Sequence, residues 1–129
     1  MSRKSKGIDA ERELIHMFWE RGWAAIRVAG SGSGSYPSPD ILAGNPLRKL
    51  AIECKTTKGK SIYIAKNEIE ALNSFAGIYG SEPWLAARFD KKGWFFMSLD
   101  DLVQTSANFC VTKSLASKKG FSISELTQS

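Results

Sequence analysis

Three charged residues near the middle of the chain have the types and the spacing of a site for phosphate chemistry. Asp40 follows a proline, and Glu53 and Lys55 flank Cys54 further along the chain. Successive side chains of a strand point to opposite faces, so Glu53 and Lys55 share one face if this segment is a strand. If Asp40 opens a neighbouring strand, its carboxylate meets Glu53 and the two can hold one hard cation. Magnesium binds through few carboxylates and keeps several waters, which suits phosphate chemistry, and manganese is the alternative.

The hydrolysis of a phosphodiester explains why these residue types belong together. The reaction needs an acidified water, a neutralised non-bridging oxygen and a stabilised leaving alkoxide, and one or two divalent ions supply all three. An adjacent lysine can orient the water or stabilise developing charge. We therefore expect a metal-dependent nuclease in which Asp40 and Glu53 are direct ligands and Lys55 lies beside them. The backbone carbonyl of Cys54 is a further candidate ligand.

Each of these residues also has an ordinary structural interpretation. Aspartate after proline is common in turns for conformational reasons alone. Glu53 and Lys55 could equally form an ion pair at an exposed strand end. The apolar residues before them favour a functional site, because residues 50–52 are Leu-Ala-Ile and should be buried. The two charged side chains then emerge where a core strand reaches the rim of the sheet.

A third carboxylate, Glu11, is predicted on the apolar face of an N-terminal helix. The pattern predicts this helix over about residues 9–21, with Asp9 or Ser5 as the N-cap and Gly22 at the C-terminal stop. The apolar stripe around Glu11 comprises Ile8, Ile15 and Phe18. A carboxylate on such a stripe is unfavourable unless it is paired, neutralised or bound to metal. Glu11 therefore joins the candidate site as a direct ligand, a ligand through water, or part of a second metal site.

The remaining pattern alternates between strand and helix signals and predicts an α/β fold. Strand patterns cover residues 23–29, 41–43, 50–56, 62–64, 84–89, 94–99 and 109–112, and a second helix pattern covers 65–79. A Gly-Ser-rich segment over 30–38 is predicted to be a surface loop that either contacts the substrate or is disordered. This order of elements implies a central mixed β-sheet flanked by helices. We expect a single domain over 1–129, in which about 4–99 carries the nuclease core and 100–129 forms a C-terminal part.

Composition limits the partners without selecting one. The chain has 129 residues and a formal net charge of +5, which favours nucleic acid, a membrane surface or an acidic protein. The lysines that are either solvated or in contact with phosphates are Lys58, Lys60, Lys113, Lys118 and Lys119. No apolar run reaches the roughly 20 residues that a membrane helix needs, and the basic N-terminus does not resemble a signal peptide. Cys54 and Cys110 are too few for a zinc set and are expected to be reduced thiols, although one bridge is conceivable, so we expect a cytoplasmic protein.

Together, Glu11, Asp40 and Glu53-x-Lys55 resemble the motif of the PD-(D/E)xK nuclease superfamily. Within it, the chain resembles the archaeal Holliday junction resolvase family over about residues 4–99. The segments that carry the resemblance are 4–7, 10–14, 22–27, 39–41, 43–45 and 52–55. The resemblance implies a restriction-endonuclease-like nuclease fold. It also implies a homodimer that cuts two opposing strands of a four-way DNA junction.

The resemblance implies roles for individual residues. The catalytic residues would be Glu11, Asp40, Glu53, Lys55 and a loop serine, Ser31. Arg12 and Arg27 would bind phosphates, and the further DNA-binding candidates are Lys4, Lys6, Lys58 and Lys60. Phe75 and Tyr79 would lie at the dimer interface.

Two other functions remain open at the level of sequence. One is a related metal-dependent endonuclease that acts on a specific or damaged duplex, but no separate sequence-reading domain is recognisable in this short chain. The other is a catalytically silent junction-binding module, which the intact set of three acids and a lysine disfavours. The sequence does not identify protein partners such as a sliding clamp or other recombination proteins.

Overall fold

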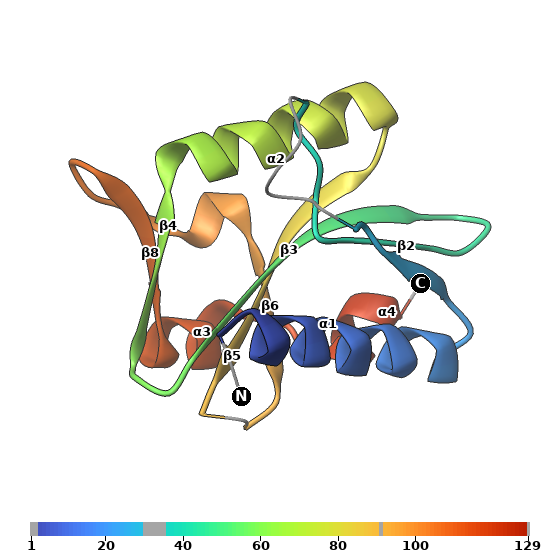
Figure 1. Ribbon diagram of the computed structural model, residues 1–129, viewed down its shortest axis with the longest axis horizontal. Helices are drawn as coiled ribbons and strands as arrows, with labels where there is room; N and C mark the ends of the chain where they lie inside the picture. Colours follow the sequence, from blue (N-terminus) through green and yellow to red (C-terminus); the bar gives the residue numbers. More distant parts are fainter. Residues whose placement is uncertain (1–2, 30–35, 91, 129) are drawn as a thin grey trace.

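The computed structural model describes residues 3–29, 36–90 and 92–128, with the backbone alone for residues 3–6 (Figure 1). The helices are α1 (Arg3–Glu20), α2 (Lys66–Tyr79), α3 (Lys113–Lys119) and α4 (Ile123–Thr127), and a 3-10 helix, η1, covers Leu99–Asp101. The strands are β1 (Ala24–Arg27), β2 (Ile41–Gly44), β3 (Lys49–Thr57), β4 (Ser61–Ala65), β5 (Glu82–Phe89), β6 (Trp94–Ser98), β7 (Val103–Gln104) and β8 (Asn108–Thr112).

The main sheet contains five strands in the order β1-β2-β3-β5-β6. Its neighbouring strands are antiparallel, except that β3 and β5 are parallel. A parallel pair needs a crossover connection, which β4 and α2 provide here. The predicted α/β class with a central mixed sheet flanked by helices is confirmed.

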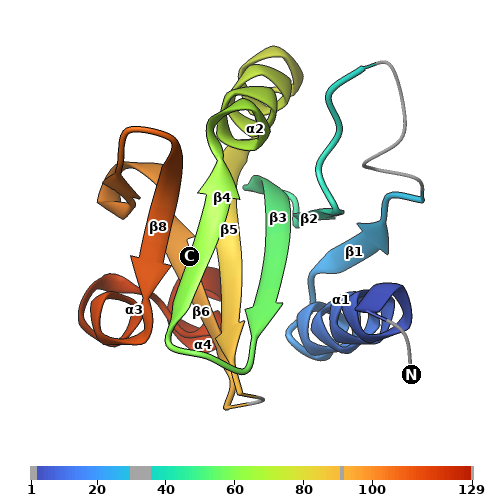
Figure 2. The same ribbon diagram turned by 60° about the vertical axis from the view of Figure 1, so that its left-hand side comes forward.

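Helices cover both faces of the main sheet. One face packs against α1 and α4 in a core that includes Leu14, Phe18 and Ile123, which we call the α1-side core. The other face packs against α2, through Ile69 and Leu72, and against the second sheet, in what we call the α2-side core. Figure 2 shows α1 on one side of the molecule and β8 with α3 on the other.

The alternation of side chains along β3 decides which functional residues face which helix. Leu50 and Ile52 belong to the α1-side core, and Ala51 between them belongs to the α2-side core. All three are completely buried, as predicted. Because the alternation continues along the strand, Glu53 and Lys55 lie on the face that α2 covers.

The first helix begins earlier than predicted. It begins at Arg3, so Asp9 and Ser5 both lie inside it and the predicted N-caps were wrong. A side-chain acceptor caps a helix only at its end, whereas Lys and Arg are strong helix formers, so the basic segment extends the helix. The predicted stop is confirmed, because Gly22 has a φ of 80°, in the left-handed region that glycine tolerates best.

The last thirty residues contain more regular structure than the sequence indicated. The elements η1, β7, α3 and α4 were not predicted, and β8 pairs with β4 in a second sheet of order β4-β8-β7. This part of the chain contributes to both cores through Leu102, Val111, Ala116, Ile123 and Leu126. One signal was available for α4, since Ser122 and Glu125 form a capping box at its start.

Two expectations from composition can be compared with the structure. In the described part of the chain, no helix is long and apolar enough to cross a membrane. Cys54 and Cys110 are both free, so the two cysteines do not form a disulfide. The reduced state of the two thiols stays a prediction.

Candidate active site

Asp40 lies where the ladder between β2 and β3 ends. Its backbone N–H donates to the Ile52 carbonyl at 3.0 Å, and the Val28 N–H donates to the Asp40 carbonyl at 2.8 Å. Pro39, just before it, is buried and has no N–H to continue the ladder. The Cys54 N–H donates instead to the Asp40 side chain, with 2.9 Å between N and Oδ2. Proline and aspartate together therefore hold one carboxylate against the middle of β3.

Glu53 and Lys55 interact with each other and with α2. The Nζ of Lys55 is 3.8 Å from Oε2 of Glu53 and 2.7 Å from Oε2 of Glu68. The shared face predicted for Glu53 and Lys55 agrees with both contacts. Glu53 and Lys55 thus form the ion pair that a purely structural interpretation would expect. The closer partner of Lys55, however, is the Glu68 carboxylate on α2.

Glu11 approaches from the other face of the sheet. Its side chain is 16% exposed, and its Oε1 is 3.8 Å from Nη1 of Arg27 on β1. Asp40 is close enough to both Glu11 and Glu53 to change their ionisation. The three acids are therefore arranged across the edge of the sheet, with Asp40 between the other two.

Burial and mutual repulsion raise the pKa values of two of these acids. Burial first, and then the charge of Asp40, raises the pKa of Glu53 to about 9, although Lys55 opposes the shift. The same two causes raise the pKa of Glu11 to about 7, although Arg27 opposes the shift. Carboxyl groups crowded in this way keep their protons unless a cation compensates their charge. This edge of the sheet therefore favours a bound divalent ion.

The donor set fits a hard cation that keeps most of its waters. Asp40 and Glu53 offer carboxylate oxygens from adjacent segments, and the Cys54 carbonyl points to the same edge of β3 as its N–H. Among the residues that the structure describes, no three Asp, Glu, His or Cys side chains are grouped closely enough to form a metal site. Magnesium does not require such a group, since it binds proteins through one or two carboxylates and retains several waters.

Not all predicted site residues can be placed. Ser31 and the side chains of Lys4 and Lys6 lie outside the described residues. Arg12 is exposed on α1 next to Glu11 in the sequence. Arg27, on β1, lies beside the Glu11 side chain. Lys58 and Lys60 are exposed just beyond the end of β3.

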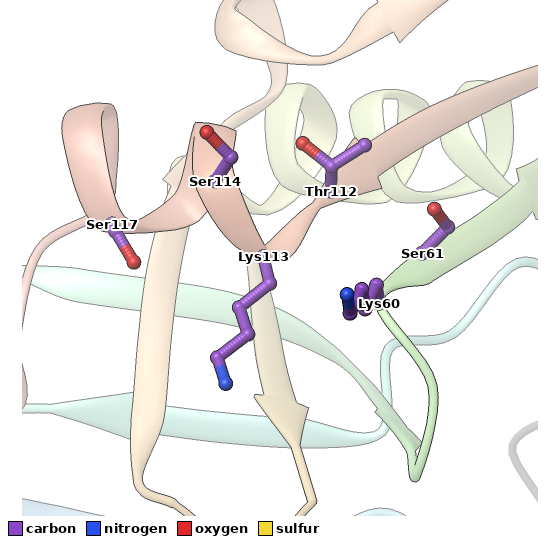
Figure 3. A pocket seen from close by; sticks show the side chains of 6 residues that line it. All are labelled: Lys60, Ser61, Thr112, Lys113, Ser114 and Ser117. Atoms are coloured by element: carbon purple, nitrogen blue, oxygen red, sulfur yellow. The ribbon is translucent and has the colours of Figure 1, made fainter.

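A shallow pocket continues this basic surface beyond β3 (Figure 3). It is lined by Lys60, Ser61, Thr112, Lys113, Ser114 and Ser117. The Lys113 N–H donates to the Lys60 carbonyl at 2.8 Å, so the two segments are held together. Contact with Lys92 and the charge of Lys92 lower the pKa of Lys113, because several ammonium groups are crowded here. Such a surface favours an anionic partner.

The two predicted interface aromatics lie in different environments on α2. Phe75 packs against the α2-side core, whereas Tyr79 is 47% exposed. Their ring centroids are 5.4 Å apart. Ile78, next to Tyr79 in the last turn of the helix, is 88% exposed, so this end of α2 presents an apolar surface.

Glu68 is a residue of this site that the sequence interpretation missed. It occupies the first turn of α2, where its Oε1 accepts the Ala65 N–H at 3.4 Å. The available signal was a glutamate in the first turn of a helix that was predicted to begin at Ala65. That signal indicates a cap, and only the packing of α2 against β3 reveals the contact with Lys55.

A mixed sheet with Asp40 directly before one strand and Glu53-x-Lys55 on the next defines a nuclease fold of the PD-(D/E)xK class. The family model described as archaeal Holliday junction resolvase (Hjc) matches residues 2–129. The chain belongs to this family. The match includes the last thirty residues, so the extent of about 4–99 inferred from the sequence was too short.

Individual relatives agree with this assignment. A protein of Archaeoglobus fulgidus named crossover junction endodeoxyribonuclease Hjc is 43% identical over 112 residues, which are 87% of this chain and 82% of the relative. A protein of Sulfolobus acidocaldarius with the same name is 35% identical over 130 residues, covering 99% of this chain and 90% of the relative. The structure of A. fulgidus Hjc, a Holliday junction resolvase, matches with a TM-score of 0.89 and 38% identity, covering 95% of this chain and 100% of that one.

Proposed function

We propose that this protein is a metal-dependent endonuclease that resolves four-way DNA junctions by cutting two opposing strands. The observation that carries the proposal is the Asp40 carboxylate held on the Cys54 N–H beside Glu53 and Lys55. Membership of the archaeal Holliday junction resolvase family supports the substrate class. The names of the relatives, crossover junction endodeoxyribonucleases, support hydrolysis of the DNA backbone as the reaction.

Asp40 and Glu53 would hold a divalent ion, with Glu11 and the Cys54 carbonyl as further ligands. Magnesium is the proposed ion and manganese the alternative. When bound, the ion acidifies a water, neutralises a phosphate oxygen and stabilises the leaving oxygen. The hydrogen bond from Cys54 keeps the Asp40 carboxylate in place before substrate arrives, so little reorganisation is needed during the reaction.

Lys55 would act on the reacting phosphate as a charged hydrogen-bond donor. Burial opposes its charge, but the hydrogen bond and charge of Glu68 outweigh burial and raise the pKa of Lys55. The ammonium therefore keeps its proton at neutral pH. It can donate a hydrogen bond to the attacking water or to an oxygen of the phosphate that gains charge in the transition state.

The DNA backbone would follow the basic residues around the edge of the sheet. Arg27 lies within reach of the site through its contact with Glu11, and exposed Arg12 extends this side. Lys58 and Lys60 continue the positive surface beyond β3 into the pocket of Figure 3. The roles proposed for Ser31, Lys4 and Lys6 rest on the family resemblance alone.

A homodimer would supply two active sites for two cuts. Opposing strands of a four-way junction are related by approximate two-fold symmetry, which a symmetric dimer can match. Exposed Tyr79 and its core-packed neighbour Phe75 support an interface at the C-terminal end of α2.

Two further inferences belong to this proposal. We infer one domain over residues 1–129, because the last thirty residues contribute to both cores of the same sheet. We also infer a cytoplasmic location, since both cysteines are free and reduced thiols persist in that compartment.

The decisive experiment compares a synthetic four-way junction with a linear duplex of the same sequence, each incubated with protein and Mg²⁺. Paired cleavage of the junction alone is expected. Cleavage of the linear duplex at one sequence or lesion would instead establish the related duplex endonuclease. Tight junction binding without cleavage in either Mg²⁺ or Mn²⁺ would establish a silent binding module.

A further inference from the structure

The ammonium group of Lys55 lies closest to a carboxylate on α2. The distance from Nζ to Oε2 of Glu68 is 2.7 Å, against 3.8 Å to Oε2 of Glu53. The side chains of Lys55 and Glu68 are 30% and 36% exposed, so the contact is partly shielded from water. A lysine has a flexible four-carbon stem, so a defined position of its ammonium needs a fixed partner.

Glu68 is itself fixed by the start of α2. Its other carboxylate oxygen, Oε1, accepts the Ala65 N–H at 3.4 Å. The helix that carries it is anchored in the α2-side core through Ile69 and Leu72, which are 4% and 3% exposed. One oxygen of Glu68 therefore accepts the Ala65 N–H and the other accepts from Lys55, and the same carboxylate shares a hydrogen bond with Glu53.

We propose that Glu68 is a positioning residue of the active site, which holds the Lys55 ammonium at the rim of β3 for reaction with the DNA phosphate. The inference rests on the proposed nuclease function and assigns a role to a residue outside the motif of acids and lysine. Glu68 acts through Lys55 and contacts neither the metal nor the DNA in this role.

The geometry gives Glu68 a second effect on the same site. Without it, the nearest carboxylate to Lys55 is Glu53, and a close Lys55–Glu53 pair would occupy oxygens that the divalent ion needs. Glu68 holds the ammonium at 2.7 Å while the ammonium stays 3.8 Å from Glu53, and the Glu68 carboxylate also shares a side-chain hydrogen bond with Glu53. The helix carboxylate thus limits the approach of the lysine to Glu53, and it contacts both charged residues of the Glu53-x-Lys55 motif.

The test is a double-mutant cycle in the full-length protein. Single-turnover cleavage of a four-way junction is measured for wild type, Glu68→Ala, Lys55→Ala and the double variant, and junction affinity is measured separately in Ca²⁺. Glu68→Ala is expected to slow cleavage by about 10–100-fold. Its junction affinity is expected to stay within about twofold of wild type. In the Lys55→Ala background, Glu68→Ala is expected to slow cleavage much less than in the wild-type background, because the residue through which it acts is gone and only its contact with Glu53 remains.

A matched control and a spectroscopic measurement separate positioning from loss of the helix cap. Glu70 is exposed on the same helix, and Glu70→Gln should cleave at the wild-type rate. The ¹H–¹⁵N resonance of the Lys55 ammonium should be visible in wild type and in Glu70→Gln. It should be lost in Glu68→Ala, whether or not the protein cuts junctions.

Two results would overturn the inference. One is an equal slowing by Glu68→Ala in the wild-type background and in the Lys55→Ala background, which indicates a merely structural role. The other is an unchanged ammonium resonance in Glu68→Ala. Failure of the wild-type protein to cut a junction would overturn the proposed function instead, since the ammonium signal is measured without DNA.

Discussion

Asp40 is positioned by its own backbone as much as by its side chain. Its N–H and carbonyl bond to β3 and to Val28, and its carboxylate accepts the Cys54 N–H that a longer β2 would have bound. A side chain held in this way is oriented before any ligand arrives.

Asp40→Asn should abolish cleavage while leaving junction binding intact. The amide keeps the shape and can still accept the Cys54 N–H, but it removes the negative charge from the metal site. We expect a single-turnover rate at least about 100-fold lower than wild type, with a junction dissociation constant within about twofold. Asp100→Asn, at an exposed position on η1, is the matched control and should cleave normally. Normal cleavage by Asp40→Asn would contradict the assignment of this ligand.

Glu53→Gln should stabilise the metal-free protein at alkaline pH. Burial and the charge of Asp40 raise the folded-state pKa of Glu53 to about 9, well above its ordinary value of 4.5. Below the unfolded pKa both states carry the proton. As pH rises toward the folded pKa, only the unfolded state has released it, so stability falls. In EDTA, the Tm of wild type should therefore fall from about pH 5 to about pH 9, and that of Glu53→Gln should fall less.

Added Mg²⁺ provides the complementary measurement for Glu53. The ion should raise the Tm of wild type at about pH 8, because it binds the ionised carboxylates of the folded state. It should have a much smaller effect on Glu53→Gln. Equal pH profiles for the two proteins in EDTA would show that Glu53 is not the source of the instability.

At the scale of elements, the C-terminal helices attach to the main sheet through close backbone approaches. Gly120 ends α3 next to β6, and an added Cβ there would lie 2.6 Å from the Ala116 carbonyl oxygen and 3.1 Å from the Phe95 Cβ. The neighbouring Phe121 bridges to Phe96 on β6. The approach of α3 to the sheet therefore depends on a residue without a side chain.

Gly120→Ala should destabilise the protein by about 1–3 kcal/mol, because a backbone oxygen cannot move away as a flexible side chain can. The matched control is Gly77→Ala, inside α2, where a Cβ would meet nothing within 4 Å. That change should stabilise by about 0.5–1 kcal/mol, since alanine is the better helix former. Urea unfolding of both variants measures the two effects, and a Gly120→Ala protein as stable as wild type would contradict the predicted clash.

At the scale of the whole molecule, the basic surface and the apolar end of α2 define how DNA and a second subunit would bind. Lysines from the turns after β3 and β5 and from the start of α3 are close enough to influence one another's charge. The exposed apolar residues Ile78 and Tyr79 lie at the C-terminal end of the crossover helix.

The affinity of the wild-type protein for the junction should fall steeply as the salt concentration rises. The affinity of the double variant Lys60→Ala/Lys113→Ala should fall less steeply. Each lost phosphate contact lowers the slope of log affinity against log salt by about 0.9, so the variant should lose about 2 from the slope. Fluorescence titrations between about 50 and about 200 mM salt measure this slope, with Ca²⁺ present to prevent cleavage. An unchanged slope would show that both lysines are merely solvated.

Tyr79→Asp should weaken the homodimer and uncouple the two cuts. A charge introduced into an apolar interface must be desolvated, which opposes association. Sedimentation should show monomers at concentrations where wild type is dimeric, and junction products should become single nicks. Val103→Asp changes another exposed apolar residue, 54% accessible on β7, and should leave the dimer unchanged.

The local pattern of the chain determined much of this structure before any coordinates. Short apolar runs located β2 and β3, and apolar residues at helical spacing located α2, each to within a few residues, because burial is a local constraint on the sequence. The Pro39-Asp40 pair and the Glu53-x-Lys55 spacing identified the candidate chemistry by residue type. Capping preferences were less informative, since Ser5 and Asp9 proved to lie inside α1.

Tertiary structure decided which of these residues meet. The alternation of side chains along β3 puts Glu53 and Lys55 on the face that α2 covers, whereas Glu11 lies on α1 at the opposite face. No local pattern encodes the contact between Glu68 and Lys55, because it depends on how a crossover helix packs back onto its strand. The pairing of β4 with β8 is equally non-local, since α2, β5, β6, η1 and β7 lie between the two strands in the chain. Residue types and spacing are properties of neighbouring positions, whereas these contacts exist only once distant segments share a core.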